Sequence, residues 1–152
     1  MNTRNQLDYQ VKIIALWTVF LLGTIFHTQL ALMPLFHGFD VAIVGHQHDT
    51  ESSQTIAEIA PILWGMLVFF TIPMVAIVTT TFNKSQHYRV FHFWLTMVYT
   101  VLNFLHVVLD LFVEPLFWYQ IALMTLLFGF GILLNLISYQ WMRVDLRRQR
   151  IA

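Results

Sequence analysis

Long apolar segments alternate with short polar ones along the chain. Four apolar segments exceed the roughly 20 helical residues that cross a bilayer. They are residues 12–34, 59–81, 89–113 and 116–141. Because short connections join the last three segments, antiparallel neighbours are the economical arrangement. The pattern predicts an all-α integral membrane protein, an up-down bundle of four transmembrane helices that forms a single domain over residues 1–152.

Composition supports lipid as the surroundings of this chain. Hydrophobic residues make up 58% of it and charged residues 11%, with a mean hydropathy of +0.67. A soluble domain carries about a quarter charged residues. The absence of cysteine excludes disulfides, thiolate ligands and iron–sulfur clusters. A formal net charge of zero argues against nucleic acid as a partner, and we find no phosphate-binding loop for a nucleotide.

The basic residues predict the orientation. All eight lie on one side of the four predicted spans: Arg4, Lys12, Lys84, Arg89, Arg143, Arg147, Arg148 and Arg150. The connection 35–58 contains no lysine or arginine. By the positive-inside rule we expect both termini in the cytoplasm. The loop 35–58 then faces the periplasm or a lumen, in a plasma membrane or a thylakoid-type inner membrane.

One face of the third predicted helix is polar. Its members recur every three or four residues: His92, Thr96, Tyr99, Asn103, His106, Asp110 and Glu114. At about 100° per residue they fall within an arc of roughly 80°. An ionisable group in hydrocarbon is costly unless it is paired, so we expect this polar face to point into the bundle. Thr100 lies off this face, where its hydroxyl can bond to the helix backbone.

Two histidines of this face, His92 and His106, lie about 21 Å apart along the helix axis. This separation is similar to that of the two haem-ligating histidines on one helix of the cytochromes b. His27, on the first predicted helix, lies at nearly the same depth as His106. No predicted span carries a histidine partner for His92. One chain therefore offers one bis-histidine pair, and a second haem at His92 would need a homodimer, a methionine ligand or a neighbouring subunit.

The loop between the first two spans is acidic and rich in histidine. With the head of the second span and the outer end of the third, it supplies candidate metal ligands: His37, His46, His48, Glu58, Asp110 and Glu114. Imidazole and carboxylate together suit Zn²⁺, Cu²⁺ or Fe²⁺. Asp110 lies four residues after His106, so its carboxylate can bind a metal directly or orient the imidazole. A solvated acidic loop without a metal is the plainer interpretation.

Three functions agree with these observations. The first is a membrane electron-transfer subunit that holds haem b through His27 and His106, with His92 as a further candidate ligand. The second is a non-haem protein that binds or transports copper, zinc or iron. The third is a pigment-binding or assembly subunit of a larger membrane complex. In each case we expect other membrane subunits or a homodimer as partners, and enzymatic activity stays open.

Overall fold

Four long helices make up the described part of the chain. The structure is a computed structural model that describes residues 3–36, 56–83, 85–112 and 116–149, and it describes side chains within 7–33, 60–83, 85–112 and 116–143. The helices are α1 (Thr3–Phe36), α2 (Ile56–Phe82), α3 (Gln86–Asp110) and α4 (Trp118–Gln149). Each is long and apolar enough to cross a membrane, over Leu7–Met33, Ala60–Phe82, Gln86–Asp110 and Trp118–Arg143 respectively. The prediction of four helices of membrane-spanning length is confirmed.

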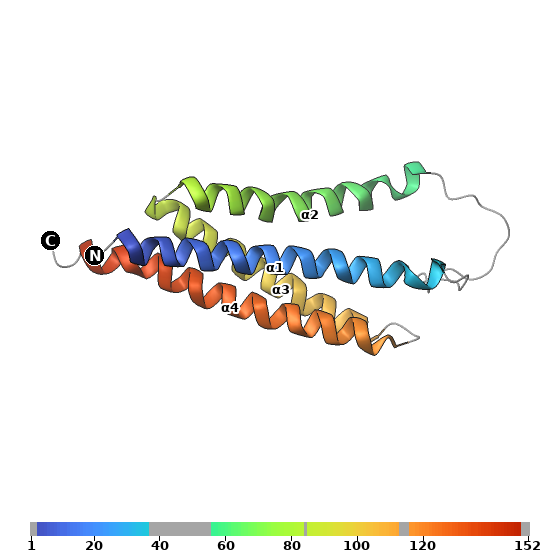
Figure 1. The fold of residues 1–152 in the computed structure, drawn as a ribbon. Helices are drawn as coiled ribbons and strands as arrows, with labels where there is room; N and C mark the ends of the chain where they lie inside the picture. The colour runs from blue at the N-terminus through green and yellow to red at the C-terminus, as the bar shows by residue number, and fades with distance from the viewer. Residues whose placement is uncertain (1–2, 37–55, 84, 113–115, 150–152) are drawn as a thin grey trace.

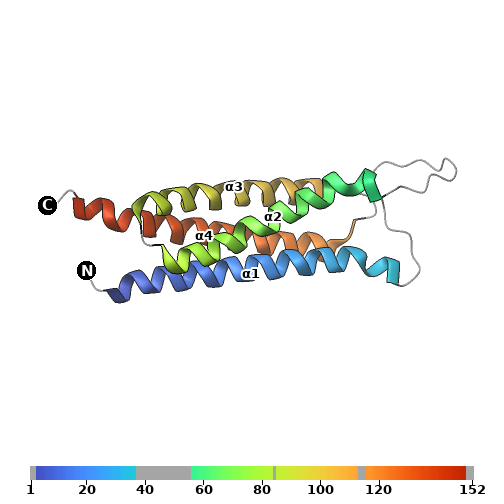
Figure 2. The ribbon, with the colours of Figure 1, turned by 90° about the horizontal axis from the view of Figure 1, so that it is seen from above.

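Successive helices run in opposite directions (Figure 1). α1 packs against both α2 and α4, and α3 packs against α4. The start of α1 and the end of α4 lie at the same end of the bundle as the short α2–α3 turn (Figures 1 and 2). We call this the inner end, and we call the opposite end, where α1 finishes and α2 begins, the outer end.

Aromatic rings and one glycine bring α1 close to its neighbours. Trp17 is fully buried and packs edge-on against Phe20 and Tyr99, with ring centroids 5.9 and 5.3 Å away. A Cβ atom at Gly23 would overlap the Leu127 side chain, so glycine permits the close approach of α1 to α4. These contacts fix the rotation of α1, and with it the direction in which α1 presents its polar side chains.

The polar face of α3 points into the bundle, as predicted, from His92 to Asn103. His92 and Thr96 have no exposed surface, and Asn103 is 5% exposed. Thr100 donates its hydroxyl to the Thr96 carbonyl at 2.9 Å, which confirms the expected bond to the helix backbone, and accepts the Asn135 amide at 3.0 Å. This last bond joins α3 to α4.

α2 contacts α3 through long side chains at the inner end and at the middle of the two helices. The Tyr88 hydroxyl donates to the Ala76 carbonyl at 2.9 Å, and the Tyr99 hydroxyl donates to the Phe69 carbonyl at 2.7 Å. Nearer the outer end, no hydrogen bond joins α2 to α3 within the described ranges. A cavity of about 490 Å³ lies there, lined by residues of all four helices.

Candidate metal centre

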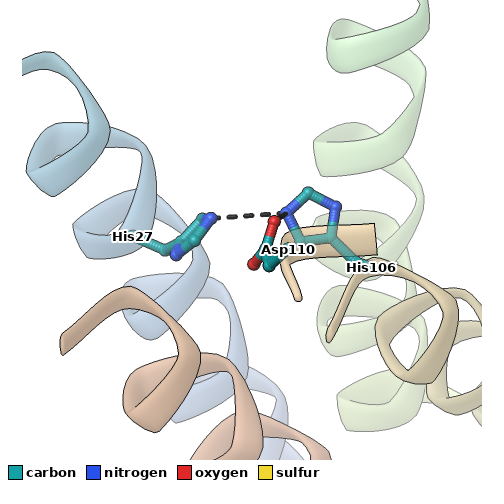
Figure 3. Close-up of polar contacts among 3 residues, drawn as sticks. All are labelled: His27, His106 and Asp110. Carbon is teal, nitrogen blue, oxygen red and sulfur yellow. Dashed lines mark hydrogen bonds and ion pairs between the residues drawn. The ribbon is translucent and has the colours of Figure 1, made fainter. Parts of the chain in front are cut away.

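His27 of α1 and His106 of α3 meet in the outer half of the bundle. Their Nε2 atoms are 3.3 Å apart, and the two rings point toward one another (Figure 3). Counting residues along two helices that run in the same direction placed them at the same depth, and this distance confirms it. His27 is 7% exposed, whereas the side chain of His106 is 50% exposed. Without an ion between them, one Nε2 atom donates a hydrogen bond to the other, in a direction set by the tautomers.

Asp110 completes a group of three ligands. It lies one helical turn after His106, and its Oδ1 atom is 3.6 Å from His106 Nε2 (Figure 3). One ligand atom from each of His27, His106 and Asp110 lies within 4.8 Å of the other two. Two imidazoles and a carboxylate that converge from two helices form a donor set that suits a first-row transition metal.

The distance between the two imidazole nitrogens distinguishes two kinds of cofactor. Nitrogens bound to one tetrahedral ion, with metal–nitrogen bonds of about 2.0–2.1 Å, stand about 3.3–3.4 Å apart. Nitrogens on opposite sides of a haem iron stand roughly 4 Å apart. The observed 3.3 Å equals the separation in the first arrangement and is also the length of the direct hydrogen bond between the two imidazoles. A macrocycle between the rings would also meet the Asp110 carboxylate, which lies beside them (Figure 3).

Two polar atoms of this group lack a hydrogen-bond partner among the described residues: His27 Nδ1 and Asp110 Oδ2, both buried. The sequence has no lysine or arginine between Lys12 and Lys84 or between Arg89 and Arg143. Histidine is therefore the only basic side chain that the spans offer to this carboxylate. A nearby cation stabilises the negative charge of a carboxylate, and a bound metal ion would supply one.

His92 lies at the inner end, away from this group. It has no exposed surface, and its Nε2 atom accepts a hydrogen bond from the Trp17 indole at 2.9 Å. The rings of Tyr88 and Trp141 pack around it, each with its centroid 5.8 Å from that of His92. The nitrogen that would bind a haem iron is thus engaged by tryptophan, and His92 as a cofactor ligand stays a prediction.

The remaining candidate ligands cannot be placed in the same way. His37, His46, His48 and Glu114 lie outside the described residues, and Glu58 lies in α2 at a position whose side chain is not described. Their roles stay predictions from the sequence.

Sequence reasoning missed the cavity beside His27 and His106. Gly65, Phe69 and Phe70 of α2 line it together with the two histidines, and Asn103 contributes from α3. Asn103 was identified only as a member of the polar face of α3. A glycine inside a membrane-spanning helix was the other available signal, since glycine leaves space beside the backbone.

The fold and the site define a class: a bundle of four helices of membrane-spanning length with a histidine–carboxylate group between α1 and α3 in its outer half. No protein-family model, curated protein or solved structure matches this chain. Its function has to be inferred from the residues themselves.

Proposed function

We propose that this chain is an integral membrane protein that binds one first-row transition-metal ion through His27, His106 and Asp110. The observation that carries the proposal is the 3.3 Å separation of the two Nε2 atoms, with the Asp110 carboxylate 3.6 Å from one of them. Bundles that hold metals through inward-facing histidine and carboxylate side chains are a recurrent solution. The two unpartnered polar atoms and the lack of lysine and arginine in the outer half support a cation at this position.

The donor set narrows the choice of metal. Two histidines and one carboxylate bind zinc with an open fourth position, and the same set binds non-haem iron(II) with several open positions. With no cysteine in the sequence, the chain offers no thiolate for copper(I). We therefore favour Zn²⁺ or Fe²⁺, with Cu²⁺ as the next candidate.

The orientation predicted by the basic residues gives this site a route of access. With both termini in the cytoplasm, the site lies in the half of the bundle nearest the loop 35–58, on the periplasmic or lumenal side. His37, His46 and His48 of that loop would capture the ion before it moves inward. Cysteine labelling at Gln47 and Gln149 tests the orientation: we expect Gln47 to be labelled from outside and Gln149 from the cytoplasm. Labelling of Gln47 from the cytoplasm would exclude the predicted orientation.

A b-type haem is the second candidate, and the cavity of about 490 Å³ beside the two histidines favours it. Such a haem would require His27 and His106 to move apart and Asp110 to move aside. The electron-transfer role would follow from the haem, with axial ligation and burial setting its potential. The geometry supports the metal ion better.

Elemental analysis and absorption spectra of the purified protein decide between these candidates. We expect about one zinc or iron per chain after loading and removal of excess metal, and no Soret band in oxidised or dithionite-reduced protein. A Soret band would overturn the metal proposal in favour of haem. Protein that retains no metal and no colour would exclude both.

A further inference from the structure

The cavity beside the metal centre opens to the outside of the bundle. Its volume is about 490 Å³, which lies within the range of pockets that hold small organic ligands. Met66 of α2 and Leu102 of α3 line it and are 42% and 44% exposed. The opening thus lies between α2 and α3, on the outer side of the hydrogen bond from Tyr99 to the Phe69 carbonyl. In a bilayer this opening faces the hydrocarbon, so a molecule dissolved in the membrane reaches the cavity laterally.

The side-chain amide of Asn103, on the wall of this cavity, has no hydrogen-bond partner. Asn103 is 5% exposed, and its Nδ2 atom makes no hydrogen bond among the described residues. A buried amide donor left unpaired destabilises the fold. Thr24 and Thr28, which also line the cavity, donate their hydroxyls to carbonyls of α1. A molecule that occupies the cavity would therefore stabilise Asn103 if it carried an acceptor atom for this amide.

The rest of the lining favours a flat ring. Phe20, Phe69 and Phe70 contribute aromatic rings, and Met66 and Met124 contribute thioether side chains. Aromatic faces and edges pack well against planar molecules, and methionine adapts to their shape. A flat ring with an acceptor oxygen thus suits both the apolar wall and the Asn103 amide.

We propose that this cavity binds a quinone-type molecule from the membrane, with one ring carbonyl accepting a hydrogen bond from Asn103 Nδ2. The ring lies among the phenylalanines, and the apolar tail leaves between α2 and α3. The proposal concerns binding only, and it holds whether or not a metal occupies His27, His106 and Asp110.

A phospholipid fits these observations less well. Asn103 lies seven residues before the end of α3 at Asp110, about 10 Å along the helix axis. The ester carbonyls of a phospholipid lie at headgroup level, which is nearer the helix end. An acyl chain at the depth of Asn103 carries no acceptor and no ring.

Two glycine substitutions form a matched pair for the test. A Cβ atom meets nothing within 4 Å at Gly65 or at Gly129, so both positions accept a larger side chain without a clash. Gly65 lines the cavity, whereas Gly129 of α4 is not part of its lining. Gly65→Leu narrows the cavity at its α2 wall, and Gly129→Leu controls for the general effect of replacing a helical glycine.

The experiment titrates metal-free, detergent-purified protein with decylubiquinone and follows the quenching of tryptophan fluorescence. We expect saturable binding to the wild type and to Gly129→Leu, loss of saturation in Gly65→Leu, and affinity about tenfold weaker in Asn103→Leu. Mass spectrometry of molecules extracted from the purified protein accompanies it. We expect it to find no phospholipid that the wild type retains and Gly65→Leu loses.

Three results would overturn the quinone proposal: no saturable binding to the wild type, equal binding by Gly65→Leu and Gly129→Leu, or unaltered affinity in Asn103→Leu. A phospholipid retained by the wild type and lost in Gly65→Leu, or a Soret band, would assign the cavity to another occupant. Because the protein is free of metal, these results test the cavity independently of the metal centre.

Discussion

His92 and His106 lie on the same face of one helix, fourteen residues apart, yet their surroundings differ. His92 has no exposed surface and is held by a hydrogen bond from Trp17 within a cluster of aromatic rings. His106 is half exposed, and it faces a second histidine and a carboxylate. The inner histidine has the environment of a packed core residue, and the outer one has the environment of a ligand.

The difference comes from the neighbouring helices. At the inner end, Tyr88 bonds α3 to α2 and Trp141 of α4 packs against His92. Tyr99 adds a second bond between α2 and α3 at the middle of the helices. Toward the outer end those ties are missing from the described residues, and Gly65 of α2 leaves space for a cavity. Two residues of the same type on the same helix face therefore have different surroundings, which the neighbouring helices determine.

The largest effect expected is the loss of the metal on replacing an outer histidine. His27→Leu and His106→Leu each remove one ligand of three and should reduce bound metal to background. His92→Leu should leave the metal content of the protein unchanged. Elemental analysis of the loaded variants measures this, with Val101→Leu on the exposed apolar surface of α3 as the control. If His92→Leu lost as much metal as His106→Leu, the proposal that only the outer histidine binds the metal would be wrong.

A smaller effect should follow from Asp110→Asn, which keeps the shape of the side chain and removes its charge. We expect metal affinity to fall about 10- to 100-fold, as when an orienting or ligating carboxylate is lost. Competition with a chelator of known affinity measures the change. Unaltered affinity would show that Asp110 neither binds the ion nor orients His106.

At the inner end, the expected effect is on stability. Trp17→Phe keeps an aromatic ring but leaves His92 Nε2 without its donor, which should lower the free energy of unfolding by about 1–3 kcal/mol. Thermal unfolding in detergent measures this, and metal content should not change. A loss of metal without a loss of stability would place His92 in the binding function.

The smallest effect should come from the loop. Replacing His37, His46 and His48 together with glutamine should slow metal uptake severalfold at low metal concentration and leave the metal content at saturation unchanged. The imidazoles bind metal only when they are unprotonated, so uptake by the wild type should itself slow as the pH falls. Stopped-flow measurement with a metal-sensitive dye follows the rate. Equal rates in the variant and the wild type would show that the loop histidines take no part in metal uptake.

Much of the fold and part of the site were predictable from local features of the sequence. Hydropathy identified four helices, because each span is a continuous apolar segment that needs no partner to be recognised. The 3.6-residue period identified the buried face of α3, because neighbours along a helix lie at fixed angles. The same fixed rise per residue placed His27 and His106 at one depth before any contact between α1 and α3 was known.

Only the tertiary structure decided which side chains each histidine contacts. His27 and His106 are 79 residues apart in the chain, and Trp17 and His92 are 75 apart. Whether two such side chains touch depends on how each helix is rotated and how closely it approaches its neighbours. Packing contacts, such as that of Gly23 against Leu127, determine both the rotation and the approach. The cavity arises in the same way, from space that four helices together leave unfilled. Periodicity along one helix carries no information about the rotation of another, and for this reason depth was predictable and contact was not.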